Sequence, residues 1–266
     1  MQIEIFQVDA FTARAFGGNP AAVCPLDEWL DDSTLQQIAT ENNLSETAFF
    51  VRNDEMIELR WFTPLVEVDL CGHATLATAW VLFNYFHEKS RVLNFSTRSG
   101  VLSVTRDGDF LAMDFPAKNP VQVDIPDGLA QALNLSVPIR EIYKADDYIV
   151  LVDSPDDIES LEPDFSLLAN YPVRGVVVTA AGSQFDFVSH WFGPNVGVNE
   201  DPVTGSAHTC LAPIWAEKMG KSILTAQQGG KRKGQLRCQL HTHANGESRV
   251  IISGQAVLYL HGTITV

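Results

Sequence analysis

The sequence predicts an α+β fold of two pseudo-symmetric halves, each a mostly antiparallel sheet wrapped around one central helix. Residues 72–86 form an apolar run without a polar face, which is typical of a buried helix. The residues before that run, Arg60-Trp61-Phe62-Thr63-Pro64, recur as His190-Trp191-Phe192-Gly193-Pro194 at an offset of 130 (190 − 60). A period of about half the chain indicates the duplication of one unit.

The repeat continues up to the start of each central helix. At the same offset, valines of the two copies match: Val66 and Val68 against Val196 and Val198. This alignment places Cys71 against Asp201, after which the offset becomes 133, because Gly72-His73-Ala74 aligns best with Gly205-Ser206-Ala207. If a pseudo-twofold axis relates the halves, the two helix N-termini would face one cleft and hold a carboxylate-bearing ligand between them.

Composition limits the class of protein. The 266 residues, 45% of them hydrophobic, suffice for one large domain or two small ones. A formal charge of −15 argues against nucleic acid or an anionic membrane as a partner. The central helix is too short to cross a membrane, and residues 1–6 lack the features of a secretory signal.

The four cysteines are widely spaced and form no CxxC pair: Cys24, Cys71, Cys210 and Cys238. This spacing favours free thiols in a reducing cytoplasm over a disulfide framework or a zinc site.

Alternation of apolar residues and the turn residues between them predict the elements of the first half. Strands are expected at 3–10, 21–24, 45–51, 58–62, 92–96, 100–105 and 110–115, with a hairpin turn at Asp107-Gly108. A helix around 35–39 would be capped by Asp32 or Ser33. Three prolines between 116 and 126 suggest a boundary, giving halves 1–117 and 118–266; the last strand, near 256–266, could cross back to the first half.

The second half is expected to contain the same kinds of helices and strands. Helices are expected at 129–134, 165–170 and 205–219, the last stopped by Gly220 and either kinked by Pro213 or confined by it to a first turn. Strands are expected at 148–152, 175–180, 185–192, 223–227, 235–241, 250–253 and 256–265.

Chemistry is expected first at the start of the central helix. The free amides and positive dipole end near Gly72 and His73 favour an anion. The same dipole disfavours a charged His73, so we expect a neutral imidazole for proton transfer or hydrogen bonding; a purely structural histidine is the alternative. Cys71 is interpreted as a packed residue beneath the helix start, with a catalytic thiol as the alternative.

Three further residues could carry proton chemistry. Glu46 precedes a buried run, where a carboxylate is costly unless it is paired or kept protonated. A solvated turn glutamate is the alternative. Asp201 aligns with Cys71 in the repeat, although it could lie in an exposed acidic loop. Ser206 could equally be an ordinary residue at the start of a helix.

The one basic cluster is Lys231-Arg232-Lys233, flanked by glycines. We interpret it as a solvated hairpin tip, because it lacks the spacing of a phosphate-binding P-loop.

These motifs together resemble the PhzF-like isomerases of phenazine biosynthesis, which share the diaminopimelate epimerase fold. The matching stretches span most of the chain: residues 8–12, 18–23, 44–49, 62–64, 71–77 and 200–208. The sequence departs from the family pattern after Gln228-Gly229, where Gly234-Gln235-Leu236 lacks the family's Arg-Pro.

The resemblance implies a two-domain protein with a cleft, no cofactor, no metal and a homodimeric assembly. The family's characterised activity isomerises a dihydro-hydroxyanthranilate by moving a proton around a cyclic diene acid. By motif, Glu46 would be the proton shuttle, with His73, Asp201 and Ser206 completing the catalytic set. Substrate binding would involve four further positions, Asn19, Ser45, Gly72 and Gly205.

We therefore expect a cytoplasmic, cofactor-independent isomerase acting on a small carboxylic acid, cyclic acids included, by general acid–base catalysis. The alternatives are an amino-acid racemase or epimerase with Cys71 as one base, or a protein that binds a small carboxylate without turnover.

Overall fold

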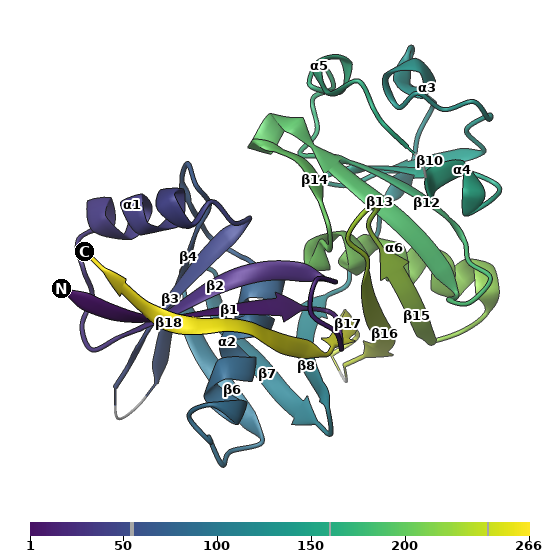
Figure 1. Ribbon diagram of the computed structural model, residues 1–266. Helices are drawn as coiled ribbons and strands as arrows, with labels where there is room; N and C mark the ends of the chain where they lie inside the picture. Colours follow the sequence, from purple (N-terminus) through teal and green to yellow (C-terminus); the bar gives the residue numbers. More distant parts are fainter. Residues whose placement is uncertain (54–55, 160, 244) are drawn as a thin grey trace. The chain divides into compact units, whose positions relative to one another are not determined.

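The computed structural model describes residues 1–53, 56–159, 161–243 and 245–266 (Figure 1). The chain divides into two compact units. Unit 1 comprises Met1–Asp114 together with Ser253–Val266, and unit 2 comprises Phe115–Ile252. Each unit combines a mixed, largely antiparallel sheet with a few helices, so the predicted α+β class is confirmed.

Unit 1 is a sheet with two helices. Its strands are β1 (Gln2–Ala10), β2 (Asn19–Leu26), β3 (Glu46–Arg52), β4 (Ile57–Phe62), β5 (Glu67–Val68), β6 (Val92–Thr97), β7 (Gly100–Asp107), β8 (Phe110–Pro116, ending where unit 2 begins) and β18 (Ala256–Thr265). Its helices are α1 (Asp32–Asn42) and α2 (Gly72–Asn84). The last strand, β18, lies antiparallel to the first, with Thr265 opposite Gln2.

Helix α2 is the core of unit 1. Ten of its 13 residues are buried, in keeping with its lack of a polar face. It packs against β1, β2 and β3, and Figure 1 shows it surrounded by strands. No helix among the described residues is long and apolar enough to cross a membrane.

Unit 2 has the same construction around α6. Its strands are β9 (Val121–Gln122), β10 (Glu141–Lys144), β11 (Tyr148–Leu151), β12 (Val176–Ala181), β13 (Phe187–Gly193), β14 (Val198–Asp201), β15 (Ile223–Gln228), β16 (Gly234–Thr242) and β17 (Ser248–Gly254, whose last two residues belong to unit 1). Its helices are α3 (Leu129–Ala132), α4 (Asp156–Glu159), α5 (Phe165–Leu168), α6 (Gly205–Met219) and a 3₁₀ turn, η1 (Pro194–Val196).

The internal repeat appears in how the strands pair. In unit 1 the pairs β1–β2, β3–β4, β4–β5 and β6–β7 are antiparallel, whereas β2–β3 and β4–β6 are parallel. In unit 2 the pairs β10–β11, β12–β13, β13–β14 and β15–β16 are antiparallel, whereas β11–β12 and β13–β15 are parallel. The two series are identical in order and direction, as duplication of one unit requires.

The alignment of Cys71 with Asp201 is wrong. Trp61 pairs with Val68, and its counterpart Trp191 pairs with Asp201 across a register shift, so Asp201 occupies the place of Val68. The residue preceding α2 is Cys71, and the residue preceding α6 is Thr204. The three extra residues of the second copy are therefore inserted before Asp201, in the segment that contains η1, and not after it.

Two helix details also differ from expectation. The N-cap of α1 is Asp31, whose carboxylate accepts a hydrogen bond from the Thr34 amide, one position earlier than predicted. Helix α6 is not confined to a first turn before Pro213, since it continues to Met219. A proline donates no hydrogen bond to the carbonyl four residues earlier. Here that carbonyl, of Thr209, accepts one from the amide of Lys118 instead, at 3.0 Å. The stop at Gly220 is confirmed, in a left-handed conformation.

Candidate active site

In unit 1, three elements bring a carboxylate, an imidazole and an amide together. Glu46 begins β3, Asn19 begins β2, and His73 is the second residue of α2. His73 Nε2 lies 3.1 Å from Glu46 Oε2, and its Nδ1 lies 3.2 Å from Asn19 Nδ2. The Cys71 thiol is also close, with Sγ 3.5 Å from His73 Nδ1. Glu46 is therefore paired, and it is not a solvated turn residue.

This cluster is well shielded from water. The His73 side chain is 5% exposed and that of Glu46 is 16% exposed. Glu46 Oε2 and His73 Nε2 have each other as ion-pair partner, and neither of these buried atoms has a hydrogen-bond partner among the described residues. A buried polar atom has a favourable free energy to gain from a hydrogen bond. The cluster is consequently prepared to exchange hydrogen bonds with a ligand.

The charge state of His73 differs from our expectation of a neutral ring. Burial lowers its pKa, but the neighbouring Cys71 and Glu46 raise it by more, so that it lies well above the usual 6.5. Burial, followed by the Glu46 carboxylate, raises the pKa of the Cys71 thiol to about 11.

The same three groups are the strongest candidates in unit 1 for a metal site. Donor atoms of Glu46, Cys71 and His73 all lie within 4.8 Å of one another. Metal binding by cysteine requires the thiolate. The raised pKa of Cys71 opposes that state in the absence of a metal ion, whereas a bound cation would favour the thiolate.

Both central helices begin as predicted, at Gly72 and at Gly205. The residues preceding them, Cys71 and Thr204, make no capping side-chain hydrogen bond among the described residues. Amides of the first helical turn that lack a side-chain cap can bind an anion. The remaining predicted binding residue, Ser45, lies half-buried directly before β3.

In unit 2, Asp201 belongs to a hydrogen-bonded network at the start of α6. Its carboxylate accepts a hydrogen bond of 2.6 Å from the Thr204 hydroxyl. Gln228, which ends β15 and is 1% exposed, accepts one from the Thr204 amide at 3.0 Å. Its side-chain amide donates to the Asp201 carbonyl at 2.9 Å and to the Thr204 hydroxyl at 3.0 Å. Gln228 thus joins the strand end to the helix start.

Ser206 has a partner that the sequence did not suggest. Its hydroxyl accepts a hydrogen bond of 2.8 Å from Arg174 Nη1. The same guanidinium binds both carboxylate oxygens of Asp147, which is 4% exposed and also accepts a hydrogen bond of 3.1 Å from Trp191 Nε1. Arg174 therefore brings a fixed positive charge to the first turn of α6.

Comparison with known proteins gives a consistent result. The model of a family described as phenazine biosynthesis-like protein matches residues 8–262. A protein named an uncharacterized isomerase, from Pseudomonas aeruginosa, is 62% identical over 264 residues, which cover 99% of each chain. Another uncharacterized isomerase, from Halalkalibacterium halodurans, is 44% identical over 268 residues, again 99% of each chain. Phenazine biosynthesis-like domain-containing protein 1 of the mouse is 40% identical over 296 aligned positions, which cover 100% of each chain.

Solved structures agree. The crystal structure of a PhzF-family phenazine biosynthesis protein from Enterococcus faecalis superposes with a TM-score of 0.95 at 43% identity, covering 100% of each chain. A hydroxyproline epimerase from Agrobacterium vitis superposes with a TM-score of 0.60 at 12% identity, covering 99% of this chain and 92% of the epimerase. This second likeness shows a shared fold.

Proposed function

The chain belongs to the phenazine biosynthesis-like protein family and is an isomerase, and we propose that it moves a proton on a small carboxylic acid by general acid–base catalysis without a cofactor. The contact between Glu46 and His73 is the observation that carries this proposal. It pairs a proton acceptor with a protonated imidazole in a site largely shielded from water. General acid–base catalysis typically contributes a rate factor of about 10²–10⁴.

In the proposed reaction, the Glu46 carboxylate removes a proton from a carbon of the substrate. The electrons of that C–H bond move into the conjugated system of the substrate acid, and Glu46 returns the proton at another carbon. The His73 imidazolium stabilises the negative charge that develops on the substrate.

The substrate carboxylate is proposed to bind at amides of a helix N-terminus, near Gly72 or Gly205. Near Gly205, Ser206 and Arg174 add a hydroxyl and a guanidinium, a combination suited to a carboxylate. Asp201 is proposed as a second acid–base group, positioned by Thr204 and Gln228. Cytoplasmic location and homodimer formation stay predictions.

The geometry disfavours the racemase alternative. A thiol base needs a substantial thiolate population, whereas the pKa of Cys71 is raised to about 11. A two-base mechanism would also place its second base at the matching position of the repeat. That position holds Thr204, whose hydroxyl is a poor base.

Deuterium exchange tests the proposal. Cyclic and amino carboxylic acids are incubated with the enzyme in D2O, and deuterium incorporation at carbon is followed by mass spectrometry. We expect the wild type to label at least one acid, and Glu46→Gln to lose labelling by a factor of about 10²–10⁴. The matched control is Glu41→Gln, an exposed position on α1, which should label that acid like the wild type. Full labelling by Glu46→Gln would show that another residue moves the proton.

A further inference from the structure

The cluster of Glu46, Cys71 and His73 offers a metal ion three different donor groups at one point of unit 1. Donor atoms of the three side chains all lie within 4.8 Å of one another. The ligand atoms of a tetrahedral zinc site lie roughly 3.3–3.8 Å apart, because its bonds are about 2.0–2.3 Å long. Small rotations of the side chains therefore suffice to bring the three groups around one ion.

The imidazole of His73 stands between the other two groups. Its Nε2 lies 3.1 Å from Glu46 Oε2, and its Nδ1 lies 3.5 Å from Cys71 Sγ. Cys71 and His73 flank Gly72 at the start of α2, and Glu46 is the first residue of β3. Because α2 packs against β3, the positions of the three groups are set by a regular helix and a strand, which are the most precise supports for a metal site.

Two donor atoms of the cluster are buried, Glu46 Oε2 and His73 Nε2. They form an ion pair with each other, and within the described part of the chain neither has a hydrogen-bond partner. The His73 side chain is 5% exposed, whereas that of Glu46 is 16% exposed, so an ion that enters from solvent meets the carboxylate first. A metal ion bound at this point would give both buried atoms a partner.

The donor types favour zinc. A thiolate, an imidazole and one carboxylate suit Zn²⁺, whereas Mg²⁺ and Ca²⁺ prefer oxygen ligands. Three protein ligands with the fourth position left to water form the usual open zinc site. The positive end of the α2 dipole opposes a cation here, but the Glu46 carboxylate and a Cys71 thiolate together match the charge of the ion. Zinc beside the sulfur also favours the thiolate.

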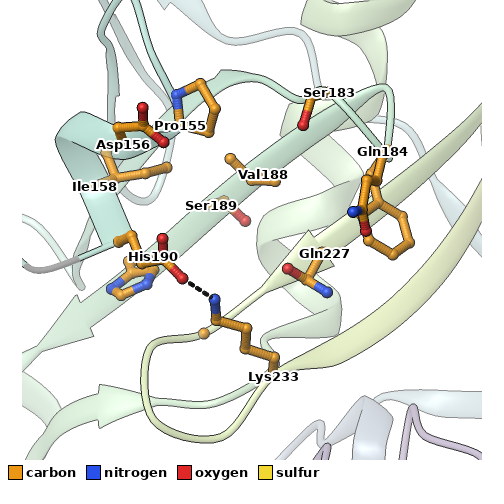
Figure 2. A pocket seen from close by; sticks show the side chains of 13 residues that line it. Pro155, Asp156, Ile158, Ser183, Gln184, Val188, Ser189, His190, Gln227 and Lys233 are labelled. Atoms are coloured by element: carbon orange, nitrogen blue, oxygen red, sulfur yellow. Dashed lines mark hydrogen bonds and ion pairs between the residues drawn. The ribbon is translucent and has the colours of Figure 1, made fainter.

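Other places in the molecule suit a zinc ion less well. The pocket of unit 2, of about 260 Å³, is lined by the carboxylates of Asp156 and Glu159, and Lys233 pairs with Glu159, a contact drawn as the dashed line in Figure 2. An ammonium group in the lining opposes a second cation. His241 and His243, at the end of β16, have ring centres 5.0 Å apart, but the group of possible ligands to which they belong contains no cysteine.

We propose that unit 1 binds a zinc ion through Glu46, Cys71 and His73, and that the bound ion inhibits the isomerase. As ligands of the ion, the Glu46 carboxylate and the His73 imidazole can no longer accept or donate a proton. Binding transfers the proton of the Cys71 thiol and that of the His73 imidazolium to solvent, because metal ligands must be deprotonated. The inhibition rests on the proposed function, whereas the binding of zinc does not.

Cobalt spectroscopy of the full-length, reduced protein tests binding without reference to catalysis. Co²⁺ accepts the same ligands as Zn²⁺, and a cobalt–thiolate bond gives a charge-transfer band in the near ultraviolet. We expect this band in the wild type, and we expect Zn²⁺ to displace the cobalt with a dissociation constant on the order of 1 µM, weaker than that of a four-ligand structural zinc site. A wild-type spectrum without the thiolate band would overturn the proposal.

Two ligand variants locate the ion. Cys71→Ser should lose the thiolate band and weaken zinc binding at least about 100-fold, because losing a group that only supports a ligand already costs about 10–100-fold. Glu46→Gln keeps the sulfur and the band, but it should weaken zinc binding at least about tenfold. The control is Cys210→Ser, which removes a buried thiol of α6 and should match the wild type. A band retained in Cys71→Ser, or unchanged zinc binding in Glu46→Gln, would contradict the site.

Deuterium labelling tests the inhibition. With an acid that the wild type labels, about half of the labelling should be lost at a free Zn²⁺ concentration equal to the dissociation constant. EDTA should restore it, and Mg²⁺ at the same concentration should have no effect. Cys71→Ser should continue to label at that zinc concentration. Labelling that persists in wild type saturated with Zn²⁺ would refute the inhibition, whereas an absence of labelling without zinc would refute the proposed function and leave the cobalt result standing.

Discussion

His73 is a buried histidine whose ionisation should make stability depend on pH. Its folded-state pKa is raised, so its favourable contribution is fully present below its unfolded value of about 6.5. That contribution is lost as the pH rises through the raised folded value. We predict that the wild type loses stability as the pH rises above about 6.5 towards the raised folded-state pKa, and that His73→Gln shows a flatter dependence.

Urea denaturation at a series of pH values measures this effect. His87→Gln is the control, because His87 is exposed and should leave the wild-type slope intact. Parallel pH dependences for His73→Gln and the wild type would contradict a protonated His73.

Arg174 is a second residue that should matter for stability, because it pairs with the buried Asp147. Replacing it by methionine leaves the buried Asp147 carboxylate without its guanidinium, and removing one member of a buried pair typically costs about 3–5 kcal/mol. We predict a loss near the lower value for Arg174→Met, because Trp191 still donates to Asp147. Urea denaturation measures the loss. Arg140→Met breaks an exposed pair with Asp153 and should change stability little; a similarly small effect of Arg174→Met would refute the prediction.

The two clusters were not equally visible in the sequence. Glu46 and His73 lie within or beside stretches whose apolar character marks them as buried, so burial and pairing could be foreseen. Arg174 and Asp147 lie outside the motifs, 27 residues apart, and only folding of β11 beside β12 brings them together. The direction of the pKa shift of His73 was also hidden, because it depends on Cys71 and on Glu46, the second of which comes from another element.

The helices and strands whose sequences show clear hydrophobic periodicity were predicted. The short strands, which are defined only by hydrogen bonding to a neighbouring strand, were not. The central helices and the long strands have enough residues to show a pattern. Strands β5 and β9 have two residues each and show none. The three-residue insertion was expected after Asp201 and lies before it, for a related reason. Both valines of the second copy fit the expected alignment, and only the register of β13 with β14 shows where the insertion lies.

Gln228 connects the end of β15 to the start of α6, and its replacement should destabilise the start of α6. In Gln228→Leu the Thr204 amide and the Asp201 carbonyl both lose a buried partner. Each such loss costs about 1–3 kcal/mol, so we predict destabilisation of at least about 2 kcal/mol in urea denaturation. Gln227→Leu, at the half-buried neighbouring position, is the control and should cost clearly less. Equal losses in the two variants would mean that the hydrogen bonds of Gln228 contribute little.

At the scale of the whole molecule, unit 1 is discontinuous in sequence, and its closure depends on the last strand. Strand β18 pairs with β1 from Gln2 to Ala10, covering one edge of that strand along its length. Without β18, the backbone groups along that edge lose their partners. We predict that deleting residues 256–266 lowers the hydrogen-exchange protection of β1 and β2, while β11, β12 and β13 keep theirs, because they belong to unit 2.

Hydrogen exchange resolved by mass spectrometry measures protection in both units of the same sample. Deleting only Thr265 and Val266 is the control, since pairing of β18 from Ala256 to Ile264 is retained and protection should change mainly at Gln2. Equal loss of protection in the two units after the longer deletion would show that they unfold as one cooperative body. A selective loss in unit 1 would instead mean that each copy of the duplicated fold depends chiefly on its own sheet and central helix, the first copy depending in addition on a strand from the far end of the chain.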